Sequence, residues 1–478
     1  MAGSPTPAPA GPRVPPWLLL GLIGVPILLV WVNLGGGAAK LPVEVRSRDI
    51  VRTMARTGDW LVPRVDGKPF LSKPPLYHWI GAAASRLRGE ADWWSVRVPS
   101  ALAAMAILGV TLAWGTALGG LALGGLAALL TGSMALFLIL ARRGAPDMVF
   151  SAACVAALFF FERLWQGRSR NLLPAFSLAL ALAALAKGTA VLPVVGAPIA
   201  LALTARWGWR KVLRRDVLLW LAAAAAMGAS WYLLIFIRLP REAMHWALLE
   251  GLQPMAVEVV GHTGRHFRPP WYYLYRIWDA ALPVSVLLPF TAWHVWRAGR
   301  WRGTGEWPFV VWSFALVVLL FSFLPAKQPH YLLPLLPLLG LMAGDALLAH
   351  LHAPGGSAGE KFLTLSAGVL LALLGGGVVL GAYYAAFVAG GGSRLAWAGV
   401  LAGGAALALA ARGWLGGRLP AACLGAVAVV GGLGLVYFGS FEEWKSLDRQ
   451  ADRAAAAAPA PGRGTPPAPP GAPVGGRP

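Results

Sequence analysis

Residues 41–79 form a polar stretch that reads LPVEVRSRDIVRTMARTGDWLVPRVDGKPFLSKPPLYHW. It follows an apolar run and is rich in charged side chains. Its acidic residues are Glu44, Asp49, Asp59 and Asp66, and its first arginines are Arg46, Arg48, Arg52 and Arg56. Lys73 directly precedes two prolines, which favour an extended backbone at that lysine. We expect this stretch to face the lipid headgroups and to carry much of an active site.

The composition is that of a membrane protein with many spans. Hydrophobic residues make up 57% of the 478 positions, charged residues make up 13%, and the mean hydropathy is +0.63. These values exclude an ordinary soluble globular protein. The net charge of +21 is explained by cationic cytoplasmic loops, so nucleic acid is not an expected partner. Cys154 and Cys423 both fall in apolar segments, which supports neither a disulfide framework nor a cysteine metal site.

The apolar runs predict an all-α polytopic membrane protein with about 13 transmembrane helices and a helical extracytoplasmic first loop. The expected spans are 17–34, 98–118, 120–140, 147–165, 172–186, 188–205, 217–237, 277–296, 307–325, 330–349, 362–388, 395–411 and 420–440. We expect the first span to be an uncleaved anchor, and a cleaved signal peptide is the alternative.

The expected organisation follows from these spans and from the composition of the chain ends. It comprises a disordered cytoplasmic N-terminus (1–16), a catalytic membrane module (17–350) with extracytoplasmic loops 35–97 and 238–276, C-terminal helices (351–440), and a charged stub with a disordered Pro/Ala/Gly-rich tail (441–478). The short basic loops predict a cytoplasmic N-terminus. The opposite face, which receives Asp147, Lys187 and Lys327, is basic too, and binding of an anionic lipid phosphate would explain those cations.

Local signals predict the structure of the polar stretch. Residues 43–57 have the spacing of an amphipathic helix that lies on the membrane surface. On its polar side Glu44 and Arg48 are spaced to form an ion pair. Gly58 is expected to end this helix, the Asp-Gly pair at 66–67 to form a tight turn, and a new helix to begin near Pro75.

Several motifs together resemble a known family. The run GDWLVPRVDGKPFLSKPPLYHW, followed by RVPSALAA, is similar to the first extracytoplasmic loop of bacterial GT-C-type glycosyltransferases. The resemblance is to the aminoarabinose transferases that modify lipid A and, more distantly, to the protein O-mannosyltransferases. RGAPDMVF, ALAKGTAVLP, RHFRPPWYYL and LPAKQPHYLLPLLPLL follow in the expected order, so the resemblance covers residues 17–350.

The resemblance implies an inverting glycosyltransferase of the bacterial inner membrane that uses no cofactor and no metal. Such an enzyme moves a sugar from a polyprenyl-phosphate carrier to a lipid A-like glycolipid or a protein on the extracytoplasmic side. The implied partners are that sugar donor, a lipid or protein acceptor, and membrane lipids. Lysine and arginine can stabilise the leaving phosphate. The implied donor-binding residues are Arg46, Lys73, Lys187, Lys327 and Tyr331, and Asp49, His266 and His330 are further candidates for the substrate pocket.

The chain departs from the family pattern at two positions. Relatives usually begin the loop with an acidic pair, whereas this chain has Val43 before Glu44, so the usual catalytic aspartate is replaced by valine. Ser72 stands where relatives of the aminoarabinose type commonly have an acid before the lysine. Glu44 or Asp147 is therefore expected to supply the catalytic base. A catalytically inactive member that binds the lipid carrier and a lipid or solute transporter remain alternatives, although a transporter should place its ionisable groups near the bilayer midplane.

Overall fold

The computed structural model describes residues 16–36, 42–167, 170–245, 268–324, 327–351 and 394–415. In these ranges the chain is helical apart from short turns and one small hairpin. The helices are α1 (Pro16–Trp31), α2 (Pro42–Thr57), α3 (Leu76–Arg88), α4 (Trp93–Gly119), α5 (Leu121–Ser133), α6 (Ala135–Ala141), α7 (Asp147–Trp165), α8 (Leu173–Lys187), α9 (Ala197–Ala202), α10 (Arg215–Arg238), α11 (Pro240–His245), α13 (Tyr272–Ala280), α14 (Leu288–Arg297), α15 (Glu306–Phe323), α16 (Leu336–Leu351) and α18 (Arg394–Leu415).

Short 3-10 and π-helical segments link several of these helices. They are η1 (Arg170–Leu172), η2 (Gly188–Ala190), η3 (Leu192–Gly196), η4 (Leu203–Trp207), η5 (Trp209–Lys211), η7 (Val284–Leu287) and η8 (Pro329–Leu335). The hairpin is formed by β1 (Arg64–Val65) and β2 (Lys68–Pro69).

Six helices within the described ranges are long and apolar enough to cross a membrane. They are Trp93–Gly119, Asp147–Trp165, Leu173–Ala190, Arg215–Arg238, Glu306–Phe323 and Pro329–His350. Each corresponds to a span predicted from the sequence, which confirms a multi-pass membrane protein. The predicted spans at 362–388 and 420–440, and the predicted disordered ends at 1–15 and 441–478, lie outside the described residues.

Three predicted spans are interrupted rather than continuous. The span expected at 120–140 consists of α5 and α6, which are bent by 72° at Met134. A distant segment stabilises the bend, because the backbone amide of Ala135 donates to the carbonyl of Leu282 at 2.8 Å. The span at 188–205 contains two π-helical turns, and the one at 277–296 is divided into α13, η7 and α14. Prolines lie in both of these segments, and a proline cannot donate the hydrogen bond of a regular helix.

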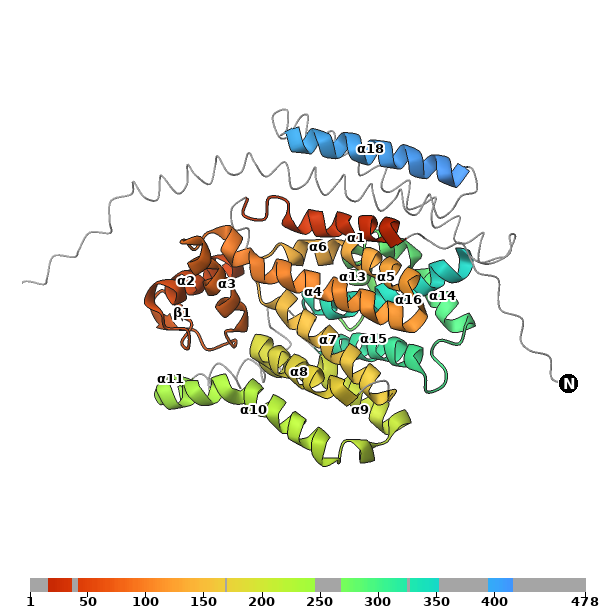
Figure 1. Cartoon of the computed structure of the whole chain (residues 1–478). Helices are drawn as coiled ribbons and strands as arrows, with labels where there is room; N and C mark the ends of the chain where they lie inside the picture. The colour runs from red at the N-terminus through yellow and green to blue at the C-terminus, as the bar shows by residue number, and fades with distance from the viewer. Residues whose placement is uncertain are drawn as a thin grey trace, which may run out of the picture.

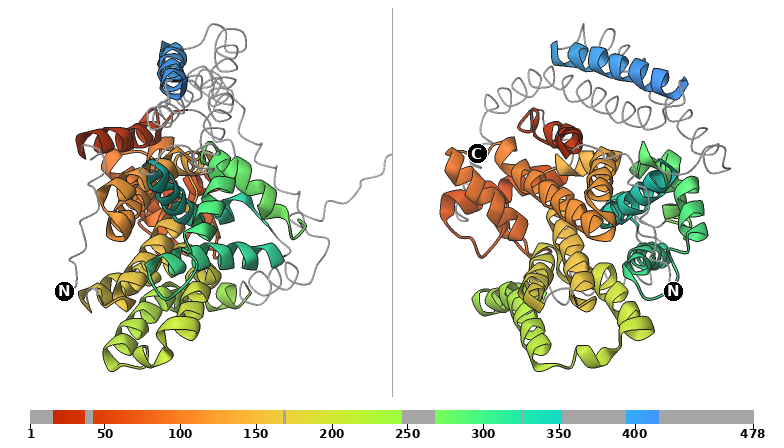
Figure 2. Two further views of the ribbon diagram at one scale, coloured as in Figure 1. Left: turned by 90° about the vertical axis from the view of Figure 1, so that its right-hand side faces the viewer. Right: turned by 45° about the vertical axis from the view of Figure 1, so that its right-hand side comes forward.

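The helices form a bundle in which α7 has a central position. Figures 1 and 2 agree that α4 and α5 lie on one side of α7, with α8 and α10 on the other. Helix α16 packs against α5 so closely that a Cβ on Gly340 would lie 2.2 Å from Oγ1 of Thr131. Close approach through small residues is the usual basis of helix packing in membranes.

The polar stretch lies at one end of this bundle, where α2, the hairpin and α3 are grouped together (Figure 1). The three local signals are confirmed. Gly58 has a φ of 74° directly after α2, Asp66 and Gly67 form the hairpin turn with φ values of 49° and 76°, and α3 begins immediately after Pro75. The helix at 43–57 exists, but its apolar face does not lie free on a membrane surface. Ile50 and Met54 are fully buried beside Ala82 of α3, because the two helices cover each other's apolar faces.

Two buried or half-buried arginines join the segment after α1 to the rest of the bundle. The guanidinium of Arg142 donates to the carbonyls of residues 29, 30, 32 and 33, at 2.6 to 3.2 Å. Arg97 donates to the carbonyls of Leu34 and Gly36 at 3.1 and 2.7 Å. A helix leaves its last carbonyls without partners in the helix. These arginines therefore satisfy the end of α1 and fix the entry into the polar stretch.

Candidate active site

Ionisable side chains from four separate segments meet at the end of the bundle that carries the polar stretch. Asp147 is the first residue of α7, Lys187 is the last of α8, and His330 lies in η8. The Nζ of Lys187 is 2.6 Å from Oδ1 of Asp147, and Nε2 of His330 is 3.5 Å from the same oxygen. Because α7 and α8 pack side by side, the start of one helix and the end of the next meet at this edge.

Lys73 belongs to the same cluster through its electrostatic environment. Burial lowers the pKa of Lys73 from its usual 10.5, nearby Asp147 opposes this shift, and Lys187 and Arg46 add to it. Neighbouring positive charges disfavour the protonated form of Lys73. We refer to Lys73, Asp147, Lys187 and His330 as the charged cluster. It contains more positive than negative charge when both lysines are protonated, so an anion would be bound favourably here.

Aromatic rings line the cluster. The Nζ of Lys187 lies 5.6 Å from the centroid of the Phe150 ring and 5.5 Å from that of Tyr331. The guanidinium carbon of Arg46 lies 4.9 Å from the centroid of Phe70. Rings at these distances attract the cations and limit their mobility. The structure thus brings Arg46, Lys73, Lys187 and Tyr331 together, four of the five residues named for donor binding.

His78 also lies near the cluster, although no sequence pattern marks it as a candidate. It lies on the first turn of α3, shortly after Lys73 in the sequence, and is only 3% exposed. Burial, with Lys73 and Arg46 nearby, lowers its pKa to about 3, so the imidazole is neutral at physiological pH. Its Nδ1 has no hydrogen-bond partner among the described residues. The only sequence signal for His78 is its place within the YHW end of the quoted motif.

Glu44 supports the turn that precedes Asp147. Its Oε1 accepts hydrogen bonds from the backbone amide of Gly144, at 2.8 Å, and from Nε of Arg97, at 3.2 Å. From α4, Ser100 donates its hydroxyl to the carbonyls of Arg143 and Ala145. The turn at 142–146 is therefore held from two helices, and this fixes where α7 begins.

The predicted pairing of Glu44 with Arg48 is wrong. Arg48 instead donates through Nε to the carbonyl of Ala91 at 3.2 Å and lies over the ring of Trp93. Glu44 is only 4% exposed. A buried carboxylate is stable only where several donors reach it, and Arg97 with the Gly144 amide supplies them.

Three other candidate residues are not part of the charged cluster as described. Nζ of Lys327 donates to the carbonyls of Arg268, at 2.8 Å, and Leu324, and burial lowers its pKa. Oδ2 of Asp49 accepts the backbone amide of Asp66 at 3.0 Å and so holds the hairpin. His266 lies outside the described residues.

No group of three or more His, Cys, Asp or Glu residues within the described ranges is arranged to hold a metal ion. The expectation of a reaction without a metal or cofactor stays a prediction.

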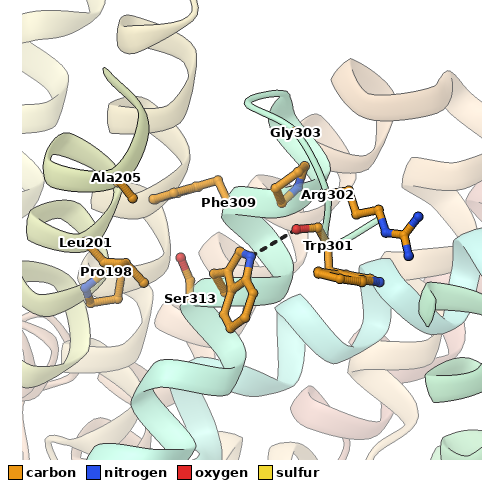
Figure 3. Close-up of a pocket in the computed structure, with 11 residues that line it drawn as sticks. Pro198, Leu201, Ala205, Trp301, Arg302, Gly303, Phe309 and Ser313 are labelled. Carbon is orange, nitrogen blue, oxygen red and sulfur yellow. Dashed lines mark hydrogen bonds between the residues drawn. The ribbon is translucent and has the colours of Figure 1, made fainter. Parts of the chain in front are cut away.

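A cavity of about 460 Å³ lies elsewhere, between α9 and α15 (Figure 3). Its lining includes Leu201, Phe309 and Trp312, and Nε1 of Trp312 donates to the carbonyl of Trp301. None of the candidate site residues lines this apolar cavity.

Comparisons with known proteins give a family model, curated relatives and solved structures that are similar to this chain. The family model described as dolichyl-phosphate-mannose-protein mannosyltransferase matches residues 72–234. The undecaprenyl phosphate-alpha-4-amino-4-deoxy-L-arabinose arabinosyl transferase 1 of Pseudomonas fluorescens (strain Pf0-1) is 24% identical over 365 residues. That alignment covers 75% of this chain and 62% of the relative. The transferase of Edwardsiella ictaluri is 27% identical, over 70% of this chain and 59% of its own length. The chain therefore spans about three fifths of the length of the curated relatives it matches.

Solved structures show the same fold. ArnT from Cupriavidus metallidurans bound to undecaprenyl phosphate superposes with a TM-score of 0.72 at 20% identity, over 93% of this chain and 80% of that one. The arabinosyltransferase EmbB from Mycobacterium smegmatis gives a TM-score of 0.51 at 17% identity, over 95% of this chain and 44% of that one. The chain has the GT-C-type fold of ArnT. The resemblance to the superfamily of aminoarabinose transferases and protein O-mannosyltransferases is confirmed.

Replacement of Gly144 by alanine should disturb the turn before Asp147. An added Cβ would lie 2.7 Å from Cγ1 of Val96, 3.3 Å from the hydroxyl of Tyr77 and 3.4 Å from Oε1 of Glu44. Overpacking of this kind typically costs about 1–3 kcal/mol. We expect Gly144→Ala to lower the free energy of unfolding by that amount, measured in mixtures of dodecyl sulfate and a mild detergent.

Gly109→Ala is the matched control, because a Cβ at this position in α4 meets nothing within 4 Å. Alanine should leave the stability unchanged or raise it slightly, since glycine weakens a helix interior. Equal stability of the wild type and the Gly144 variant would contradict the proposed packing of the turn.

Proposed function

We propose that this chain is an inverting glycosyltransferase that moves a sugar from a polyprenyl-phosphate carrier to a lipid A-like glycolipid or a protein. The observation that carries the proposal is the charged cluster, in which the Asp147 carboxylate lies 2.6 Å from Lys187, with half-buried Lys73 nearby. A phosphodiester donor needs cations at its leaving phosphate, and an acceptor hydroxyl needs a base. This cluster holds both kinds of group together.

The relatives indicate which class of lipid carrier the sugar donor contains. The curated transferases are named for undecaprenyl phosphate carrying an aminoarabinose, and one ArnT structure contains undecaprenyl phosphate. We extend the carrier class, a long-chain polyprenyl phosphate, to this chain.

In the proposed reaction, the acceptor oxygen attacks the anomeric carbon from the side opposite the phosphate. The new carbon–oxygen bond forms as the bond from carbon to the phosphate oxygen breaks, and the electron pair leaves with polyprenyl phosphate. Lys73 and Lys187 would stabilise the charge that develops on the leaving phosphate, with Arg46 nearby and Tyr331 beside Lys187. The proton of the acceptor would pass to Asp147. Cationic stabilisation of this kind needs no metal.

Of the two acids proposed for the base, the geometry favours Asp147. It lies within the cationic cluster, whereas Oε1 of Glu44 is bonded to Arg97 and to the Gly144 amide. We propose that Glu44 acts by positioning the turn at 142–146. His330, 3.5 Å from Asp147, would help to orient that carboxylate.

The remaining expectations belong to the same proposal. They are a catalytic module at 17–350 that includes extracytoplasmic loops 35–97 and 238–276, about 13 spans, a bacterial inner-membrane location, and an active site on the extracytoplasmic side. The grouping of ionisable residues at one end of the bundle supports a one-sided enzyme. A transporter should instead place such residues near the bilayer midplane.

Lys73→Ala should abolish sugar transfer while the protein stays folded. Loss of one group that stabilises a developing negative charge typically lowers kcat about 10²–10³-fold. The measurement is the transfer or release of labelled sugar from a polyprenyl-phosphate donor by the purified chain. Lys68→Ala, an exposed lysine on β2, should keep the wild-type rate, and equal rates for both variants would remove Lys73 from the site.

Donor binding should also depend on pH through Lys73. The pKa of Lys73 lies below 10.5. The ammonium that binds phosphate is therefore present below this lowered pKa and is lost as the pH rises through it. In the wild type, affinity for polyprenyl phosphate should therefore decline on the alkaline side. Lys73→Arg should retain affinity to higher pH, because arginine stays protonated up to about pH 12. Identical alkaline declines would show that another group controls binding.

Asp147→Asn and Glu44→Gln should separate base catalysis from positioning. Removal of a general base typically costs about 10²–10⁴ in rate, so Asp147→Asn should lose transfer while still binding polyprenyl phosphate. Glu44→Gln should lower thermal stability more than Asp147→Asn does, because it removes the charge that faces buried Arg97 and weakens the contact that holds the Gly144 turn. Full activity of Asp147→Asn, together with an inactive but stable Glu44→Gln, would assign the base to Glu44.

A further inference from the structure

We infer that a cavity between α2 and α3 binds the phosphate of an anionic lipid headgroup, at a site separate from the charged cluster. The cavity measures about 470 Å³, and we call it the arginine cavity. It is lined by Arg48, Arg52, Ala55, Arg56, Ser85, Arg86, Gly89, Glu90 and Ala91. Four of these nine residues are arginines and one is acidic, so the lining strongly favours an anion.

Two of the arginines are held in place before any ligand arrives. Nε of Arg48 donates to the carbonyl of Ala91 at 3.2 Å, and the guanidinium lies 4.5 Å from the ring centroid of Trp93. Nε of Arg86 donates to the carbonyl of Ala55 at 3.2 Å, and its guanidinium lies 5.1 Å from the ring of Trp60. These contacts use Nε and one face of each guanidinium. The terminal nitrogens, which can form paired hydrogen bonds to phosphate, have no hydrogen-bond partner among the described residues.

The other two arginines carry charge that is not neutralised locally. Arg52 and Arg56 lie one and two turns after Arg48 on α2, and both are exposed. In the described parts of the chain, neither has a carboxylate within ion-pair distance. Like charges four residues apart repel each other on a helix. A bound anion would relieve that repulsion, and this is the physical basis of the proposed site.

The position of the cavity identifies the source of the anion as the membrane. Residues 89–91 of its lining directly precede α4, which begins at Trp93 and is long enough to span a bilayer. Tryptophans at the start of a span lie at the level of the headgroups. Leu87, next to Arg86, is 91% exposed, as expected for an apolar side chain in contact with lipid. The arginine cavity thus opens where lipid phosphates lie.

The arginine cavity and the charged cluster lie on different sides of α2. Arg46 contacts Phe70 and affects the pKa of Lys73, whereas Arg48, two residues later, contacts Trp93. Successive positions two apart point in nearly opposite directions on a helix. A lipid bound in the arginine cavity would therefore contact one side of α2, while the opposite side of α2 faces the charged cluster.

The test is lipid binding by the full chain, measured by native mass spectrometry in a mild detergent. Phosphatidylglycerol and phosphatidylcholine are titrated separately, because both contain a phosphate but only the first is anionic overall. The wild type should bind one phosphatidylglycerol more tightly than phosphatidylcholine. Arg52→Gln combined with Arg56→Gln should weaken that site about 30-fold, as expected for the loss of two interfacial arginines.

The matched control removes the same number of charges from the same end of the molecule. Arg64 and Arg88 do not line the cavity and already have acidic partners, Asp59 at 3.9 Å and Asp92 at 2.8 Å. Arg64→Gln combined with Arg88→Gln should leave phosphatidylglycerol binding unchanged. Because the readout is binding, its result is independent of whether sugar transfer is observed.

Three results would overturn the proposal. Equal loss of binding in both double variants would indicate a diffuse surface charge, and equal affinity for the two lipids would remove the selectivity for an anionic headgroup. Displacement of phosphatidylglycerol by an equimolar amount of inorganic phosphate would indicate a site for a free anion. Each of these contradicts a lipid-phosphate site in the arginine cavity.

Discussion

The arrangement of the charged cluster depends on the ion pair between Asp147 and Lys187, whose charged atoms are 2.6 Å apart. Asp147 is 9% exposed, and a carboxylate so poorly hydrated requires a cationic partner nearby. Because Asp147 begins α7 and Lys187 ends α8, the pair also fixes how the ends of these helices meet. A phosphate that bound to Lys187 would compete with Asp147 for the same ammonium. Donor binding would then release the carboxylate that we propose as the base.

Around this pair lies a second set of buried polar contacts that determines its position. Glu44 binds the Gly144 amide, Ser100 binds two carbonyls of the same turn, and Arg142 binds the carbonyls that end α1. Such contacts are expensive to break in a low-dielectric environment because each partner would be left unsatisfied. They link α1, α2 and α4 to the start of α7. The polar stretch therefore positions the site as well as contributing Lys73 to it.

Much of this could be predicted from the sequence, and the failures have physical causes. Apolar runs predicted the six long helices, and the turn residues Gly58, Asp66, Gly67 and Pro75 marked the local structure correctly. The breaks at Met134 and near Pro283 were missed, because hydropathy records whether a segment is apolar and not whether its backbone continues. The Ala135 amide finds its partner at Leu282, far away in the sequence.

The candidate site shows the same division. Motif resemblance named Arg46, Lys73, Asp147, Lys187, His330 and Tyr331, which the fold brings together. It could not identify Arg97, whose partners Leu34 and Gly36 lie 63 and 61 positions away. For the same reason Glu44 was assigned to Arg48, its neighbour along the helix. Lys327 also lies in a family motif, and in the described residues its Nζ donates to backbone carbonyls, so its role in donor binding stays a prediction.

The most direct measurement is an experimental structure of the full chain in a lipid nanodisc with polyprenyl phosphate bound. Phosphate oxygens are expected within about 3 Å of Nζ of both Lys73 and Lys187, the range of charge-assisted hydrogen bonds. The carboxylate of Asp147 is expected to be displaced from Lys187. A phosphate bound away from both lysines, with the Asp147–Lys187 pair unchanged, would contradict the proposed donor site.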